Sequence, residues 1–138
     1  MTAAVLALLV LALFGVVFFN RIGSHGIIKS VNCQVWLDSA LTQNASVIGI
    51  DWGFLSPGTE TNKTIYIQNT SNVPLNLTLA TENWLPNATS NYMNLFWNYN
   101  GTLLTVGQVL PTILMLDVYS NITGITNFSF TIDIIGNG

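Results

Sequence analysis

Eight asparagines in this 138-residue chain stand in N-x-Ser/Thr tripeptides, the acceptor sequence for N-linked glycans. They are Asn44, Asn62, Asn69, Asn76, Asn87, Asn100, Asn121 and Asn127. Sixteen asparagines, with Ser or Thr at roughly one position in six, would give about three such tripeptides by chance. The excess predicts an extracellular, glycan-bearing surface from residue 44 to residue 138, although an Asn- and Thr-rich strand protein can also accumulate these tripeptides through composition alone.

The other residues that could do chemistry are few. With one histidine, His25, and one cysteine, Cys33, a Ser/His/Asp triad or a multi-histidine metal site cannot be assembled within one chain. Together with Met93 and Met115 these two supply part of a blue-copper ligand set, but such a site needs a second histidine. The acidic residues are scattered singly, without the clustering of a calcium loop. We therefore expect no enzymatic activity, no metal and no cofactor.

Composition narrows the class of protein further. Half of the residues are hydrophobic and only 7% are charged, which predicts a folded domain with a neutral polar surface. Beyond residue 30 one cation, Lys63, stands against six acids, so nucleic acid is disfavoured as a partner. A single cysteine allows no intrachain disulfide, and we expect Cys33 to be a buried strand residue. Having few carboxylates predicts that stability survives acidification.

The elements that must position the glycan acceptors are strands. A period of two begins at Ser30, where Val31, Cys33 and Val35 share one face. Further strand-like runs cover 47–54, 63–69, 74–81, 93–99, 110–119 and 126–135. Asn100-Gly101 is a strong signal for a tight hairpin turn. About seven short strands predict an immunoglobulin-like β-sandwich.

The last run has the clearest alternation. Phe128, Phe130, Ile132 and Ile134 share one face, so we expect this strand to be central to the core.

The N-terminal residues have a different character. Residues 3–19 are uncharged and apolar, and wound as a helix they would be about 25 Å long with no polar side. Such a helix must lie in lipid or among other helices. Small residues would let a second helix approach closely. The expected assembly positions are Ala3, Ala4, Ala7, Leu8, Leu11, Ala12, Gly15 and Phe18.

Arg21 comes directly after this apolar run, and no basic residue precedes it. Positive charge on that side favours a cytoplasmic location for the C-terminal part of the chain, which conflicts with the glycan acceptors. A mature chain whose basic leader was removed before Met1 resolves the conflict, and a plain membrane anchor is the alternative. Gly23 and Gly26 are expected to form a joint. The predicted organisation is an assembly helix at 1–22, a hinge at 23–29 and a glycosylated sandwich at 30–138.

This organisation resembles that of archaeal type IV pilins and archaellins. The loose sequence likeness rests on Ser24-His25-Gly26, Ile50-Asp51-Trp52-Gly53-Phe54-Leu55-Ser56-Pro57-Gly58, Tyr66-Ile67-Gln68-Asn69, Asn83-Trp84-Leu85-Pro86 and Gly124-Ile125-Thr126-Asn127-Phe128. Val5 stands where bacterial pilins usually carry a glutamate, which favours the archaeal kind. The resemblance implies helices packed in a filament core, sandwiches outside and a role in adhesion.

Two functions are therefore open. The first is the structural subunit of an extracellular pilus-like homopolymer used in adhesion, which is anchored in the membrane before assembly and binds identical subunits. The alternative is a monomeric, membrane-anchored sandwich that recognises sugar or another envelope protein. Exposed aromatic side chains such as Trp36 or Trp84 could stack on sugars in that case.

Overall fold

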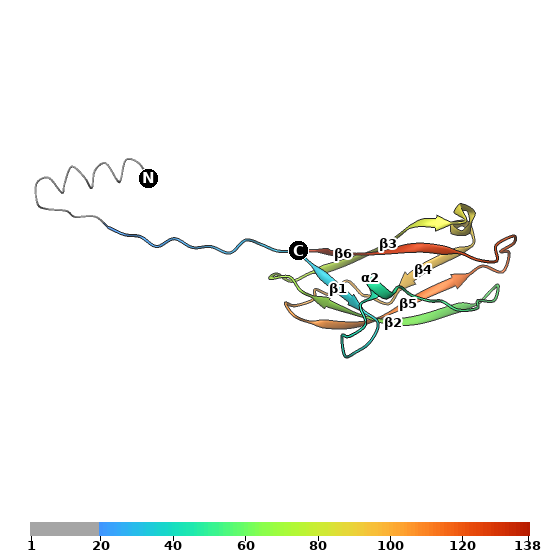
Figure 1. Ribbon diagram of the computed structural model, residues 1–138, viewed down its shortest axis with the longest axis horizontal. Coiled ribbons are helices and arrows are strands. Elements are labelled where there is room, and N and C mark those ends of the chain that lie inside the picture. The colour runs from blue at the N-terminus through green and yellow to red at the C-terminus, as the bar shows by residue number, and fades with distance from the viewer. Residues whose placement is uncertain (1–19) are drawn as a thin grey trace, which may run out of the picture.

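The computed structural model describes residues 20–138, which form a two-layered β-sandwich preceded by an extended segment (Figure 1). The strands are β1 (Cys33–Trp36), β2 (Glu60–Asn69), β3 (Asn76–Leu85), β4 (Met93–Trp97), β5 (Val109–Val118) and β6 (Ser129–Asn137). Two short helices lie between strands, α2 (Ala45–Ile48) and the 3₁₀ helix η1 (Asn87–Asn91). One sheet has the order β1-β2-β5-β4 and the other pairs β3 with β6.

The strand pairs of both sheets are antiparallel. The centre of the larger sheet is the long ladder between β2 and β5, which runs from Glu60 opposite Asp117 to Gln68 opposite Val109. Along β5 the burial alternates residue by residue, so that Leu114 and Leu116 turn inward. This is the period of two expected for a strand with one face on the core.

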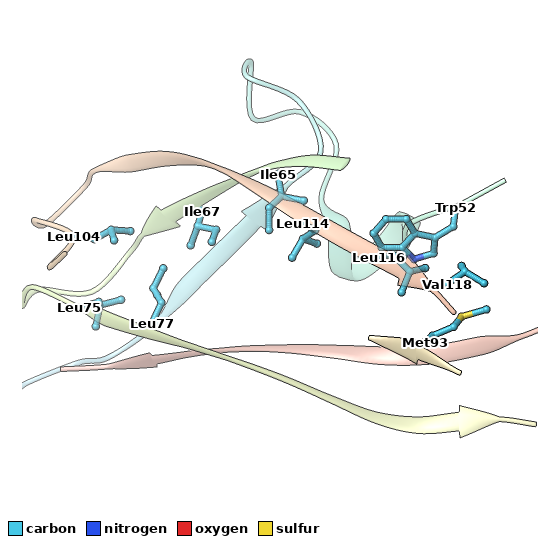
Figure 2. Packing of buried hydrophobic residues seen from close by; sticks show 10 residues of the cluster. All are labelled: Trp52, Ile65, Ile67, Leu75, Leu77, Met93, Leu104, Leu114, Leu116 and Val118. Carbon is cyan, nitrogen blue, oxygen red and sulfur yellow. The ribbon is translucent and has the colours of Figure 1, made fainter. Parts of the chain in front are cut away.

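The core fills the space between the two sheets (Figure 2). Its buried hydrophobic members are Trp52, Ile65, Ile67, Leu75, Leu77, Met93, Leu104, Leu114, Leu116 and Val118. Burying each large apolar side chain contributes about 1.5 to 3 kcal/mol. At one end the core is closed by an isolated bridge in which Leu75 and Leu104 exchange backbone hydrogen bonds of 2.9 and 2.7 Å.

The predicted fold class is wrong in its helix and in its strand number. Within residues 20–138 the helices are only four and five residues long, so no long helix is present there. Residues 20–22, assigned to the assembly helix by the sequence, have no regular secondary structure. The described chain is a mainly β fold of six strands, split four and two, in place of about seven. Residues 1–19, where the rest of the expected helix falls, lie outside the described residues.

The strand predicted at 47–54 does not form. Asn44 caps α2 through its side chain, and Gly49 and Gly53 adopt φ of 79° and 72°, which interrupts an extended chain. Only Trp52 of this run is buried, where it anchors the loop in the core.

The tight hairpin turn predicted at Asn100-Gly101 is also wrong. The antiparallel strands β4 and β5 are instead joined by a long loop that contributes Leu104 to the core. Gly101 alone of the two has positive φ.

The strand predicted to be central to the core lies at its margin. Phe128, Phe130, Ile132 and Ile134 turn toward the core and pack against it, but they are only partly buried. β6 has β3 as its neighbour on one side and no sheet neighbour on the other among the described strands. The alternation therefore identified the inward face of β6 correctly and overestimated how deeply that face is buried.

Candidate functional site

Most of the glycan acceptors lie on the outside of the sandwich. The exposed ones are Asn62, Asn76, Asn87, Asn100, Asn121 and Asn127. Asn44 is half-buried at the start of α2, where its Oδ1 accepts hydrogen bonds from the amide and the hydroxyl of Ser46 at 2.9 and 2.5 Å. These seven positions remain predictions, and the six exposed side chains have room for a glycan.

Asn69 is a correction to the predicted acceptors. Its side chain is 1% exposed, and Nδ2 donates to the carbonyl oxygens of Val73, Leu104 and Thr105 at 2.9, 3.1 and 3.1 Å. Its Oδ1 accepts from the amide of Ser71 at 2.8 Å. A glycan on Nδ2 would remove a donor hydrogen and require space that the packed core lacks. Asn69 is thus a structural residue that ties two loops together.

A groove of about 1120 Å³ runs along one side of the sandwich. Its walls come from β1 and β6, its rim includes α2 and the following loop, and its floor reaches Ile65 and Leu114. The groove exists because β1 has only four residues, whereas β2 and β6 have ten and nine. The sandwich is therefore incompletely closed between these two edges.

A local turn ends β1 early. The carboxylate of Asp38 accepts hydrogen bonds from the amides of Thr42 and Gln43, both at 2.9 Å. The amide of Leu37 donates to the carbonyl of Gln43 at 2.8 Å. The hydroxyl of Thr42 also bonds the Asp38 carboxylate, and these bonds lower the pKa of Asp38, the Thr42 side chain contributing most. The chain leaves the sheet here, so β2 loses its outer neighbour beyond Trp36.

The backbone of β6 faces this groove. The thiol of Cys33 on β1 lies 3.9 Å from the carbonyl oxygen of Ile134, which shows that this carbonyl points away from β3 and toward β1. Alternate residues of a strand direct their amide and carbonyl groups to the same side. The backbone groups of Phe130 and Ile132 therefore face the groove as well. Burial raises the pKa of the Cys33 thiol.

Residues 20–27 form an extended arm that leaves the sandwich beside the C-terminus (Figure 1). Ile22 and Ile27 on this arm are each 87% exposed. Gly23 and Gly26, the predicted joint, lie within it, and a Cβ at either would meet nothing within 4 Å. The arm thus carries large apolar side chains with no core to cover them.

The root of the arm is fixed to the sandwich. Asn72 holds it through three hydrogen bonds: its Nδ2 donates to the Ile28 carbonyl at 2.9 Å, its Oδ1 accepts from the Ser30 amide at 2.8 Å, and its amide donates to the Ser30 carbonyl at 3.2 Å. Lys29 Nζ contacts the carbonyl oxygen of Gly138. The direction of the arm is therefore set where it joins the domain.

Two acids lie on the outer face of the smaller sheet. Asp133 projects on the outer face of this strand, opposite Ala80 of β3, and Glu82 lies on the same face. Hydrogen bonding and charge repulsion from Asp133 raise the pKa of Glu82. The outer face of the smaller sheet therefore holds a negative patch made of Glu82 and Asp133.

The remaining candidate residues do not form a chemical site. His25 is exposed on the arm, Cys33 lines the groove, and Met93 is buried on β4. No group of three or more His, Cys, Asp or Glu suited to a metal occurs in residues 20–138. Within the same residues no helix is long and apolar enough to cross a membrane. The assembly positions between Ala3 and Phe18 lie outside the described residues.

The aromatic side chains that could have stacked on sugars have partners inside the domain. Trp84 stacks on Phe130 with ring centroids 4.1 Å apart, and its Nε1 donates to Thr81. Trp36 donates to Gln68 at 3.1 Å. These contacts favour a structural role for both tryptophans.

Comparison with known proteins finds no match among protein families, curated proteins or solved structures. The functional site is therefore assigned from geometry.

The sequence did not predict the groove. The alternation in 126–135 shows which side chains turn inward, but it does not show whether another strand lies beside this one. A usable signal was the early break of the first strand at Asp38.

Proposed function

We propose that this chain is the structural subunit of an extracellular, glycan-bearing filament that serves in adhesion. The observation that carries the proposal is the arm, which presents Ile22 and Ile27 to water at 87% exposure outside a sandwich that is itself well packed. Apolar side chains displayed in this way are typical of a surface that another protein covers. A subunit with one protruding apolar arm and one open groove can join to copies of itself in a head-to-tail series.

The glycan acceptors support an extracellular place for such a filament. The six exposed asparagines are spread over β2, β3, η1 and three loops, whereas Asn69, which would disturb the core, is used for packing. A surface with little charge has few other means of staying soluble, and glycans would supply hydration. Assembly through a long N-terminal helix is not part of this proposal.

The test is to shear cells that express the full chain and to examine the released material. We expect negative-stain images to show fibres, and mass spectrometry of the fibres to identify this chain with N-linked glycans. A chain found only as a monomer in detergent extracts of membrane would overturn the filament and favour the membrane-anchored binding module. Fibres without any glycan would overturn the glycoprotein part.

A further inference from the structure

We propose that residues 20–27 of a second copy of this chain add as a strand to the free edge of β6 and place Ile22 in the groove between β1 and β6. Because it joins successive subunits, this docking rests on the filament function proposed above. Strand addition of this kind gains affinity from backbone hydrogen bonds and specificity from alternate side chains.

The free edge of β6 offers the hydrogen-bonding partners. The backbone groups of Phe130 and Ile132 face the groove without a backbone partner in the described chain, whereas the Ile134 carbonyl already accepts a hydrogen bond from the Cys33 thiol. An uncovered edge with apolar neighbours readily pairs with another chain, and proteins normally protect such edges. An added strand would cover both the edge and the partly exposed side chains of β6.

The arm is long enough to cover the open part of this edge. At about 3.3 Å per residue, residues 128–133 span about 20 Å and the eight residues of the arm about 26 Å. The arm has no regular secondary structure of its own, so pairing breaks no existing element.

The arm also has one face suited to burial. Its even positions hold Asn20, Ile22, Ser24 and Gly26, none of which is ionisable, whereas Arg21 and His25 fall on odd positions. Successive side chains of a strand point to opposite faces, so the even face can enter an apolar groove without burying a charge. Ile22 is the large apolar side chain on that face.

The charged residues of the arm favour the same orientation, with the even face turned into the groove. With the even face inward, Arg21 and His25 lie on the outer face of the enlarged sheet, the face that holds Glu82 and Asp133. Opposite charges on neighbouring strands stabilise a pairing, and like charges oppose it.

The occupant has to come from another copy. The Asn72 contacts hold the root of the arm at Ile28 and Ser30, and from there the arm runs away from its own sandwich (Figure 1). The groove of the same copy lies on the sandwich, between β1 and β6. Each subunit therefore donates its arm to one neighbour and receives an arm from another.

The experiment compares Ile22→Lys with Ile27→Lys in the full chain. The two isoleucines have equal exposure on the arm but opposite parity, so only the first variant places a charge in the groove. Both lie outside the sandwich, and circular dichroism should show an unchanged β signal. We expect Ile27→Lys to form fibres like the parent chain and Ile22→Lys to remain monomeric.

Cys33 provides a second measurement, because it lines the groove. Alkylation of this thiol reports how often the groove is open. We expect alkylation in fibres of the parent chain and of Ile27→Lys to be about tenfold slower or more than in Ile22→Lys, since a protected site reacts in proportion to its open fraction.

The outcomes separate the two proposals. Fibres from Ile22→Lys with Cys33 still protected would overturn the docking and leave the filament function standing. Loss of fibres in both variants would overturn the assignment of the even face. No polymer from the parent chain, with equal alkylation of all three proteins, would overturn the filament function itself.

Discussion

At the scale of single residues, one tripeptide pattern serves two purposes. Asn69 and Asn62 both begin an acceptor sequence on β2, but Asn69 is buried and Asn62 is exposed. Burial is set by the parity of the strand, because Ile65, Ile67 and Asn69 all point inward. The strand parity of Asn69 can be read from the sequence. A polar residue at an inward position of a strand is more simply explained as a hydrogen-bonded structural side chain than as a glycosylated one.

We predict that Asn69→Ala lowers the free energy of unfolding by about 3 kcal/mol, because it leaves the Ser71 amide and three carbonyls without the side chain that bonds them. Asn121→Ala is the control, since this side chain is exposed and its change should stay within about 0.5 kcal/mol. Urea unfolding followed by tryptophan fluorescence measures both. Equal stability of the two variants would contradict the role of Asn69.

Thr89 gives a second prediction at this scale. Its side chain is fully buried, and its hydroxyl has no hydrogen-bond partner in the part of the chain that the structure describes. Replacing an unsatisfied hydroxyl with a methyl of similar shape removes a desolvation cost, so Thr89→Val should leave stability unchanged or raise it by up to about 1 kcal/mol.

The same substitution destroys the acceptor sequence at Asn87. Peptide mass spectrometry of the secreted variant should therefore lose any glycan at this position while the unfolding midpoint holds. A clear loss of stability in the protein without glycans would show that the hydroxyl has a partner.

At the scale of elements, the sequence located β1 to β6 by alternation and misplaced only the run at 47–54. Alternation reports burial of one face, which is why β5 was read correctly. It does not report how deeply that face is buried, so β6 was expected to be central to the core, whereas its inward side chains are only partly buried. The loop at 49–54 imitates a strand because Trp52 is apolar for anchoring, while the φ values of Gly49 and Gly53 cannot be read from residue type alone.

The central position of β5 is testable. Leu114 is fully buried between the sheets, so Leu114→Ala should cost about 2 to 5 kcal/mol through lost burial and a residual cavity. Leu103→Ala is the matched control, because that side chain lies in an exposed loop next to the core and should change stability by less than about 0.5 kcal/mol. Thermal unfolding of the two variants decides it. A similar loss in both would mean that Leu114 does not lie in the core.

At the scale of the whole molecule, the sequence predicted a mainly β domain with an acid-tolerant surface and could not predict the open groove, which depends on where β1 stops relative to β6. Two carboxyl groups, Asp38 and Glu82, have pKa shifts of opposite direction and bear on acid tolerance. Asp38 has a lowered pKa, so its contribution to stability is present above its unfolded pKa and is lost as pH falls through the lowered value. Glu82 has a raised pKa, so its contribution is present below its unfolded pKa and is lost as pH rises through the raised value.

Because these contributions have opposite signs, we predict thermal midpoints at pH 3 and pH 7 within about 5 °C of each other. Glu82→Gln should raise the midpoint at pH 7 and leave it unchanged at pH 3. Asp38→Asn should lower it at pH 7 and have less effect at pH 3. Calorimetry at both pH values measures this, and a collapse of the parent protein at pH 3 would refute the prediction.

The root of the arm has a mechanical consequence. The arm leads into β1, which is joined to β2 by a ladder from Cys33 opposite Asn69 to Trp36 opposite Tyr66 (Figure 1). Hydrogen bonds in an antiparallel ladder lie perpendicular to the strands, so a pull along the axis of β1 loads them in shear. The bonds then share the force and must break together, whereas peeling would break them one at a time. Under such a pull, the ladder between β1 and β2 should withstand a higher force than the short length of β1 suggests.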